Sequence, residues 1–159
     1  MIAIGIDPGL SGAVAVIDEN GVRRADEMPT VQTGKTGFVK RAVDLHGLAS
    51  ILRPYANQPL IQQSVKVFLE RVNAFPGQGT SSMFSLGMSY WGAAGVVAGL
   101  GLPLHLVEAK DWKRHFRLNA DKELARGLAA RMFPSVDLSR KKDHGRAEAL
   151  LIAAYGRTL

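Results

Sequence analysis

The chain has 159 residues, of which 47% are hydrophobic and 21% are charged. Residues 1–159 therefore have the length and composition of one soluble globular domain, which excludes a disordered or fibrous chain. The absence of cysteine excludes disulfides, thiolate zinc sites and a cysteine nucleophile. No apolar run is long enough to span a membrane, and Met1–Leu10 lacks the basic start of a signal peptide. We expect a cytoplasmic protein with no membrane contact, while an organelle stays open as an alternative.

Basic residues are concentrated in the C-terminal half. The net charge is +6, and the segment Ala109–Arg146 alone carries this excess, with 11 Lys and Arg against 5 Asp and Glu. A basic and helical segment is typical of a surface that follows the phosphates of a nucleic acid. The alternative is a solvated surface that binds nothing in particular.

The first part of the chain predicts three antiparallel strands. The apolar runs Ile2–Asp7 and Ala13–Asp18 flank a glycine-rich turn, and an Asn-Gly pair typical of a hairpin precedes Val22–Met28. After a loop at Pro29–Gly37, apolar residues at helical spacing predict a helix from Val39 to about Ala56.

Strands and helices alternate in the rest of the chain. Strands are expected at Val65–Leu69 and Pro103–Val107, on either side of a long helix at Thr80–Gly99. Three further helices are predicted at Ala109–Arg117, Asp121–Phe133 and Asp143–Arg157. Because a helix connects the last two strands, we expect them to be parallel. This order predicts an α/β fold with helices on both faces of a mixed five-stranded sheet.

Two carboxylates stand at the ends of predicted strands. Asp7 ends the first strand, and Glu70 follows the fourth. If these strands are parallel neighbours, both side chains lie at one edge of the sheet, where their repulsion favours a bound cation. Mg²⁺ prefers such oxygen ligands. Each residue alone also fits a structural role, Asp7 as a turn cap and Glu70 as the partner of Arg71.

The last helix adds two more acids. Glu148 lies in the apolar stretch Ala147–Ala154, where a charge is costly unless it has a partner. Asp143 fits either the N-cap of this helix or a metal ligand at its mouth. His144 and Glu148 are four residues apart and share a helix face. Four acids from three segments are typical of two-metal phosphoryl-transfer sites.

Three motifs together resemble the RuvC family of Holliday junction resolvases, which have the RNase H-like fold. The motifs are IGIDPGLSGAVAVI at the first strand, FLERVNAF around Glu70 and KKDHGRAEALLIAAYG at the last helix. The spacing of Asp143 and Glu148 is closer to the plastid and phage-type resolvases. The bacterial enzymes place their last two ligands three residues apart, where this chain has Gly145. The fourth ligand is therefore Asp143 or His144, and we expect Asp143.

The resemblance implies a nuclease of a bacterial cytoplasm or a phage-infected cell that resolves four-way DNA junctions. It would make paired symmetric nicks and leave 5′-phosphate and 3′-hydroxyl ends. The residues implied to hold two Mg²⁺ or Mn²⁺ ions are Asp7, Glu70, Asp143 and Glu148, with His144 as the alternative ligand. The residues implied to contact DNA are Lys113, Lys122, Phe75 and Gln78, with Phe75 as a wedge that opens the junction.

The resemblance also implies a homodimer, because two symmetric cuts require a two-fold axis. The small residues of the helix Thr80–Gly99 suit such an interface, so a bulky charge at Gly92 is expected to split the dimer; packing onto its own sheet is the alternative. A branch-migration helicase as partner is left open.

Two other functions stay open: a non-catalytic junction-binding protein, and an RNase H-like nuclease that acts on RNA or RNA–DNA hybrids. An actin-like kinase, suggested by the turn Asp7–Gly12, needs a second such domain and a second phosphate loop. The 159 residues leave no room for these.

Overall fold

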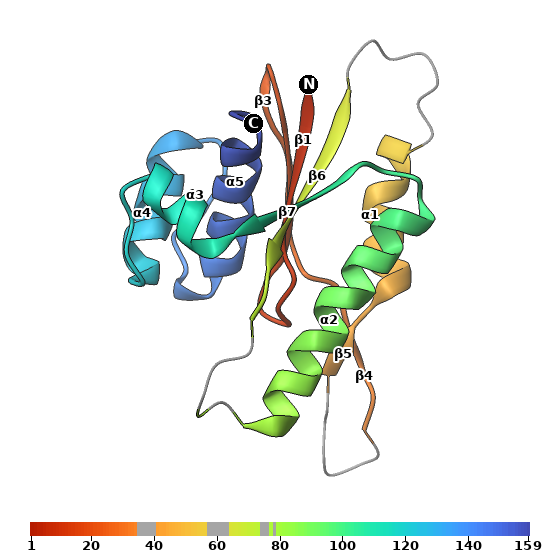
Figure 1. Ribbon diagram of the computed structural model, residues 1–159. Helices are drawn as coiled ribbons and strands as arrows, with labels where there is room; N and C mark the ends of the chain where they lie inside the picture. The colour runs from red at the N-terminus through yellow and green to blue at the C-terminus, as the bar shows by residue number, and fades with distance from the viewer. Residues whose placement is uncertain (35–40, 57–63, 74–76, 78) are drawn as a thin grey trace.

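The computed structural model describes residues 1–34, 41–56, 64–73, 77 and 79–159. A five-stranded sheet lies between two groups of helices (Figure 1). One face is covered by α1 (Leu45–Ala56) and α2 (Thr80–Gly99). The other face is covered by α3 (Ala109–His115), α4 (Lys122–Met132) and α5 (His144–Gly156). The predicted five-stranded sheet with helices on both faces is confirmed.

The sheet is mixed, with the order β3-β2-β1-β6-β7. The predicted antiparallel meander consists of β1 (Ile2–Asp7), β2 (Ala13–Asp18) and β3 (Gly21–Glu27). The strands β6 (Val65–Arg71) and β7 (Leu104–Glu108) are parallel to each other, and β6 is parallel to β1. Because Ile6 pairs with Leu69, β1 and β6 end side by side at one edge of the sheet.

Each face of the sheet has its own hydrophobic core. Along β1, the isoleucines Ile2, Ile4 and Ile6 belong to the core beneath α1 and α2. The alternate residue Ala3 belongs to the core beneath α3, α4 and α5. This division follows from the two-residue period of a strand, which turns successive side chains to opposite faces.

Helix α5 lies close against the sheet because glycines stand at the contact. A Cβ on Gly5 of β1 would lie 2.1 Å from the carbonyl oxygen of Ala149 and 2.6 Å from the nitrogen of Ala153. A Cβ on Gly156 would lie 2.2 Å from the ring of Phe68. These contacts seat α5 against the strand that carries Asp7.

We expect Gly5→Ala to lower the free energy of unfolding by about 3 kcal/mol, because the added methyl group overpacks a closed contact. Urea denaturation measures the loss. The control is Gly127→Ala on α4, where a Cβ meets no described atom within 4 Å. Since alanine favours a helix interior, this control is expected to gain up to about 1 kcal/mol. A Gly5→Ala protein as stable as the wild type would contradict the close seating of α5.

The segment before α1 differs from the prediction of a loop followed by a helix from Val39. A short strand β4 (Thr30–Gln32) pairs antiparallel with β5 (Arg41–Val43), and α1 begins only at Leu45. The Oδ1 atom of Asp44 accepts a hydrogen bond from the backbone N–H of His46 at 3.0 Å, an N-cap contact that favours a helix start here. A short apolar run does not distinguish a strand from a helix by spacing alone.

The C-terminal helices are shorter than predicted. Helix α3 ends at His115, and Arg117 follows in the left-handed region with φ 55°. Helix α4 begins after Asp121, whose side chain accepts from the backbone N–H of Glu123 at 2.9 Å. A 3₁₀ turn at Lys141–Asp143 precedes α5. None of the described helices is long and apolar enough to cross a membrane.

Candidate active site

Two carboxylates enter one pocket from neighbouring parallel strands. Asp7 is the last residue of β1, and Glu70 lies one position beyond the paired residues Ile6 and Leu69. Ile6 and Leu69 belong to the core beneath α1 and α2, so the alternation of the strands turns Asp7 and Glu70 to the α5 face. Both acids line a pocket of about 640 Å³.

Helix α5 supplies a third carboxylate to this pocket. Glu148 lines it and is only 6% exposed. The ammonium group of Lys113 lies 3.9 Å from Glu148 Oε1, which supplies the partner that a charge in this apolar helix needs. The structure therefore brings Asp7, Glu70 and Glu148 together from β1, β6 and α5, and we call this the acidic pocket.

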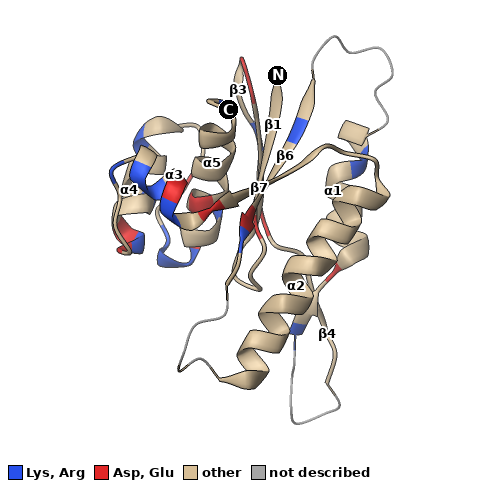
Figure 2. Cartoon of the chain, in the orientation of Figure 1, with Lys and Arg blue, Asp and Glu red and all other residues tan. Residues whose placement is uncertain are grey.

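Three lysines line the acidic pocket beside the acids. Lys113 and Lys122, both singled out in the sequence, line it together with Lys110. Figure 2 shows Lys and Arg gathered on the side of the sheet covered by α3, α4 and α5. Lys110 was not predicted individually, although the density of basic residues in Ala109–Arg146 was the available signal. This arrangement places positive charge where a polyanion would approach the acids.

Burial and nearby negative charge make Asp7 and Glu70 costly to ionise. Burial, together with the charges of Glu70 and Glu148, raises the pKa of Asp7 to about 7. The backbone N–H of Gly9 donates to Asp7 Oδ1 at 3.2 Å and partly opposes this rise. Burial also raises the pKa of Glu70, against a hydrogen bond from Trp112 Nε1 at 3.0 Å. A cation in the pocket would remove much of this cost.

The residues of the acidic pocket fit a divalent cation by their chemistry but not by their present spacing. Within the described ranges, no three His, Asp or Glu side chains lie close enough together to hold a metal ion as they stand. Asp7, Glu70 and Glu148 nevertheless line one pocket, together with Glu108, and burial and the charges of Glu70 and Glu148 raise the pKa of Asp7. Carboxylate oxygens are the ligands that Mg²⁺ and Mn²⁺ prefer.

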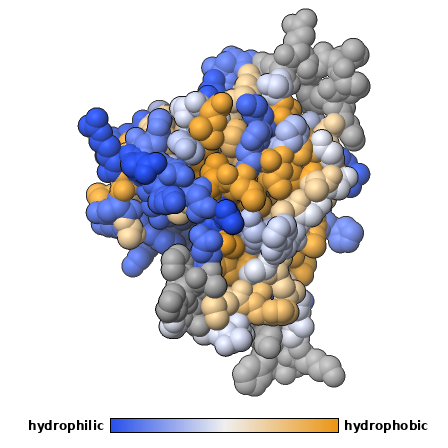
Figure 3. Space-filling view, in the orientation of Figure 1, coloured by the Kyte–Doolittle hydropathy of each residue, from blue (hydrophilic) through white to orange (hydrophobic). Residues whose placement is uncertain are grey.

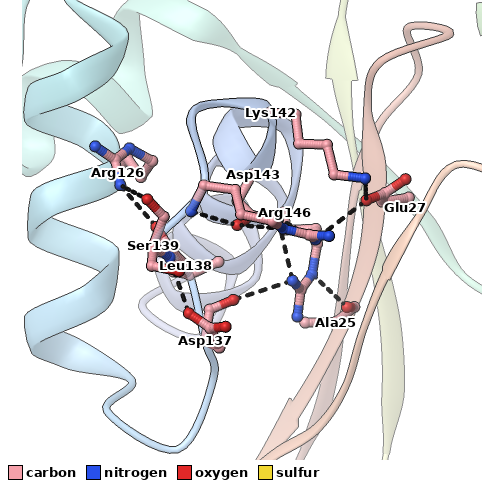
Figure 4. A network of polar contacts seen from close by, with 10 residues as sticks. Ala25, Glu27, Arg126, Asp137, Leu138, Ser139, Lys142, Asp143 and Arg146 are labelled. Atoms are coloured by element: carbon pink, nitrogen blue, oxygen red, sulfur yellow. Dashed lines mark hydrogen bonds and ion pairs between the residues drawn. The ribbon is translucent and has the colours of Figure 1, made fainter.

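Asp143 is not among the described residues that line the acidic pocket. Its buried carboxylate accepts hydrogen bonds from Arg140 Nη2 at 2.6 Å and Arg146 Nη1 at 3.3 Å. These contacts, that of Arg140 foremost, lower the pKa of Asp143 to about 2. Arg146 also donates to the carbonyl of Ala25 on β3 (Figure 4). Asp143 therefore ties the start of α5 to β3, and the structure does not bring it to the other three acids.

Asp143 occupies the N-cap position of α5, as one alternative from the sequence has it, but its side chain does not cap the helix. Its carboxylate makes no cap hydrogen bond to α5 within the described residues. It instead accepts from the backbone N–H of Arg140 at 3.0 Å and so closes the 3₁₀ turn.

His144 begins α5, one turn before Glu148, and like Asp143 it is not among the described residues that line the acidic pocket. Its Nε2 atom lies 3.1 Å from Glu123 Oε1 of α4. Its Nδ1 atom is buried and finds no hydrogen-bond partner in the described part of the chain. Buried polar atoms are usually paired, so an orphaned one needs an explanation. A carboxylate beside one ring nitrogen is a common companion of a histidine that binds metal through the other.

Phe75 and Gln78, the other two predicted DNA contacts, lie outside the described residues. They belong to the connection between β6 and α2. Their roles stay predictions.

Helix α2 exposes large apolar side chains as well as small residues. Phe84 is 70% exposed, Met88 56% and Trp91 69%; Figure 3 shows an apolar area over this part of the molecule. The expected effect of a bulky charge at Gly92 stays a prediction, and a Cβ there would lie 2.9 Å from Leu45 Cδ2. Gly92 therefore packs against α1 within the same chain.

Solved structures share this fold. The structure of RuvC from Thermus thermophilus in complex with a Holliday junction substrate matches with a TM-score of 0.61 at 15% identity. A second Thermus thermophilus RuvC structure matches with a TM-score of 0.58 at 16% identity. Each match covers 99% of this chain and 96% of the other. The chain therefore has the fold of RuvC, which confirms the predicted RNase H-like fold.

A curated relative adds a similarity in sequence. The chloroplastic Holliday junction resolvase MOC1 of Chlamydomonas reinhardtii is 32% identical over 92 residues. The match covers 55% of this chain and 10% of that protein, so the chain spans about a tenth of the length of this relative. No family model matches the chain. The resemblance to RuvC and to a plastid-type resolvase, first seen in three motifs, is confirmed.

Proposed function

We propose that the chain is a metal-dependent nuclease that resolves four-way DNA junctions by paired symmetric nicks. The observation that carries this proposal is the acidic pocket, which Asp7, Glu70 and Glu148 line together with three lysines. Further support comes from the fold, which is that of a protein solved with a Holliday junction, and from the similarity to MOC1. The products are expected to carry 5′-phosphate and 3′-hydroxyl ends.

The acids of the pocket are proposed to hold two divalent cations, Mg²⁺ or Mn²⁺. Such ions supply Lewis-acid chemistry that helps both the attacking water and the leaving 3′-oxygen in phosphodiester hydrolysis. Asp7 and Glu70 stand on two paired strands, and the close contact of α5 with Gly5 seats the helix that brings Glu148 to the same pocket. Rigid elements keep such ligands in position better than loops do.

For the fourth ligand we propose His144 in place of Asp143. The Asp143 carboxylate is already occupied by Arg140 and Arg146. His144 has a buried Nδ1 atom without a partner among the described residues, and it shares a helix face with Glu148. Glu123 lies beside its other nitrogen, as a supporting carboxylate does for many metal-binding histidines.

Two variants distinguish these ligands by Mn²⁺ binding, measured by calorimetry without DNA. His144→Ala is expected to weaken binding by about tenfold or more, because even residues that only support a ligand contribute about 10–100-fold. Asp143→Asn is expected to keep Mn²⁺ affinity within about threefold and to lower stability near pH 7. Since the pKa of folded Asp143 is about 2, this stability difference should vanish as the pH falls toward 2. The opposite order of Mn²⁺ affinities would return Asp143 to the ligand set.

The lysines of the pocket are proposed to contact DNA phosphates. Lys122→Ala is expected to lower the slope of log affinity against log salt for junction binding by about 1, because one fewer counterion is released. Fluorescence anisotropy in metal-free buffer measures this slope. Lys66→Ala, at the opposite end of β6 from the pocket, is the control and should keep the wild-type slope. Equal slopes for both variants would remove Lys122 from the DNA surface.

The homodimer is proposed to form through α2. Phe84, Met88 and Trp91 expose more apolar area than a solvated helix needs, and a two-fold contact there would relate two acidic pockets.

A further inference from the structure

A buried tryptophan lies directly behind the acidic pocket. Trp112 of α3 is fully buried in the core beneath α3, α4 and α5. Its indole Nε1 atom donates a hydrogen bond of 3.0 Å to Glu70 Oε1. A buried indole N–H generally finds a partner, and a backbone carbonyl would satisfy it without any functional consequence. Here the partner is one of the three carboxylates proposed to hold metal.

The face of the same ring carries the lysine that contacts another of these acids. Lys113 Nζ lies 5.1 Å from the centroid of the Trp112 ring, within the range of a cation–π interaction. The same Nζ atom lies 3.9 Å from Glu148 Oε1. Trp112 therefore contacts Glu70 through the edge of its ring. The face of the same ring contacts Lys113, which is the ion-pair partner of Glu148.

These contacts define the surroundings of Glu70 and Glu148. Glu70 Oε1 accepts the indole N–H, and a carboxylate has further lone pairs for another partner. The ammonium group of Lys113 provides a single positive charge beside Glu148. A hydrogen bond of 3.0 Å from a fully buried ring also restricts the rotation of the Glu70 side chain, because the donor cannot move with it.

We propose that Trp112 is a positioning residue for metal binding: its N–H holds Glu70 and its ring seats Lys113 beside Glu148, so that both carboxylates stand ready for a divalent cation. This inference rests on the proposed function, since it concerns the same pocket. It adds a residue that touches neither DNA nor metal and that acts through Glu70 and Lys113. Such supporting residues typically contribute about 10–100-fold in metal affinity.

The test removes the N–H group while keeping the shape of the side chain. Trp112→3-benzothienylalanine, introduced at this one position, replaces the indole N–H with sulfur and preserves the bicyclic ring. We expect Mn²⁺ affinity without DNA to fall about tenfold, with little change in the urea midpoint. The half-saturating Mg²⁺ concentration for junction cutting should rise by a similar factor, while the rate at saturating Mg²⁺ recovers. Tyr155→Phe removes a polar hydrogen from an aromatic residue packed against the same core and is the control.

A spectroscopic signature separates positioning from simple packing. The indole ¹H–¹⁵N resonance of Trp112 should shift when Mg²⁺ is added and also in Glu70→Gln, because its hydrogen-bond acceptor changes in both cases. An isosteric variant with wild-type Mn²⁺ affinity and wild-type half-saturation would overturn the role of Trp112 while the wild-type protein still cuts junctions. A wild-type protein that neither binds Mn²⁺ nor cuts would overturn the proposed function itself, and the role of Trp112 with it.

Discussion

Asp7→Asn is expected to abolish junction cutting and, in the metal-free protein, to increase stability at neutral pH. The pKa of Asp7 is raised from 3.8 to about 7 in the folded chain. Between these values the folded state keeps a proton that the unfolded state has released, so the stability of the wild type falls as the pH rises. The difference between these two pKa values corresponds to a loss of about 4 kcal/mol in the free energy of unfolding. Asparagine does not ionise, and the variant therefore escapes this loss while it also loses a metal ligand.

Urea denaturation in EDTA between pH 4 and pH 8 measures this effect. Wild-type stability should decline across the range, and the Asp7→Asn profile should decline less, because Glu70 then remains as the acid with a raised pKa. Asp111→Asn, a surface acid paired with Arg114, should follow the wild type. Saturating Mg²⁺ should return much of the lost stability to the wild type and little to Asp7→Asn, because ligands stabilise the state that binds them. A wild-type profile that does not fall with pH, or an Asp7→Asn protein that cuts at the normal rate, would contradict the acidic pocket.

Trp91→Glu is expected to split the proposed dimer and to uncouple the two nicks. Trp91 is 69% exposed on α2, so the folded monomer should tolerate the change. Buried in an interface beside Phe84 and Met88, the new carboxylate would be desolvated without a partner. Aromatic residues at the centre of an interface often contribute about 2 kcal/mol or more to binding.

Sedimentation at micromolar concentration measures the assembly, and a cruciform plasmid measures the coupling. The wild type should be a dimer that converts the plasmid to linear product, whereas Trp91→Glu should be a monomer that leaves nicked circles. Leu124→Glu, a 49% exposed position on α4, is the matched control and should stay dimeric. A wild-type monomer, or a dimeric Trp91→Glu protein, would show that this face of α2 is not the interface.

The sheet was predictable because each of its strands leaves a local signal. The apolar runs at Ile2–Asp7 and Ala13–Asp18 flank glycine turns, and a long helix before Leu104–Glu108 requires a parallel crossover. The hairpin of β4 and β5 was missed because three-residue strands are too short to show a period. The one sequence signal against a helix start at Val39 was Asp44, whose side chain favours a helix start at Leu45.

The candidate site was predictable where a single residue conflicts with its surroundings. Glu148 in an apolar helix is such a conflict, and it lies in the acidic pocket. The ion pairs of Asp143 with Arg140 and Arg146 were harder to predict, because they depend on how the chain folds before α5. The spacing of Arg140, Asp143 and Arg146 in steps of three was nevertheless a signal in the sequence.

Trp112 left no comparable signal. Its partner Glu70 is 42 residues away in sequence, and the contact forms because α3 directly follows β7, the strand that pairs with β6. A lone tryptophan in a basic helix predicts burial, and it says nothing about which acceptor its N–H will find.

The most direct test of the central claim compares three labelled substrates with the wild-type protein: a four-way DNA junction, a DNA duplex of the same sequence and an RNA–DNA hybrid. Each is incubated with Mg²⁺ and with EDTA, and Glu148→Gln is run beside the wild type. We predict Mg²⁺-dependent symmetric nicks in the junction, little cutting of the duplex or the hybrid, and no cutting by Glu148→Gln, although that variant still binds the junction. Junction binding without cutting in Mg²⁺ or Mn²⁺ would indicate a non-catalytic binding protein, and preferential cutting of the hybrid would indicate an RNA-directed nuclease; either result would contradict the account.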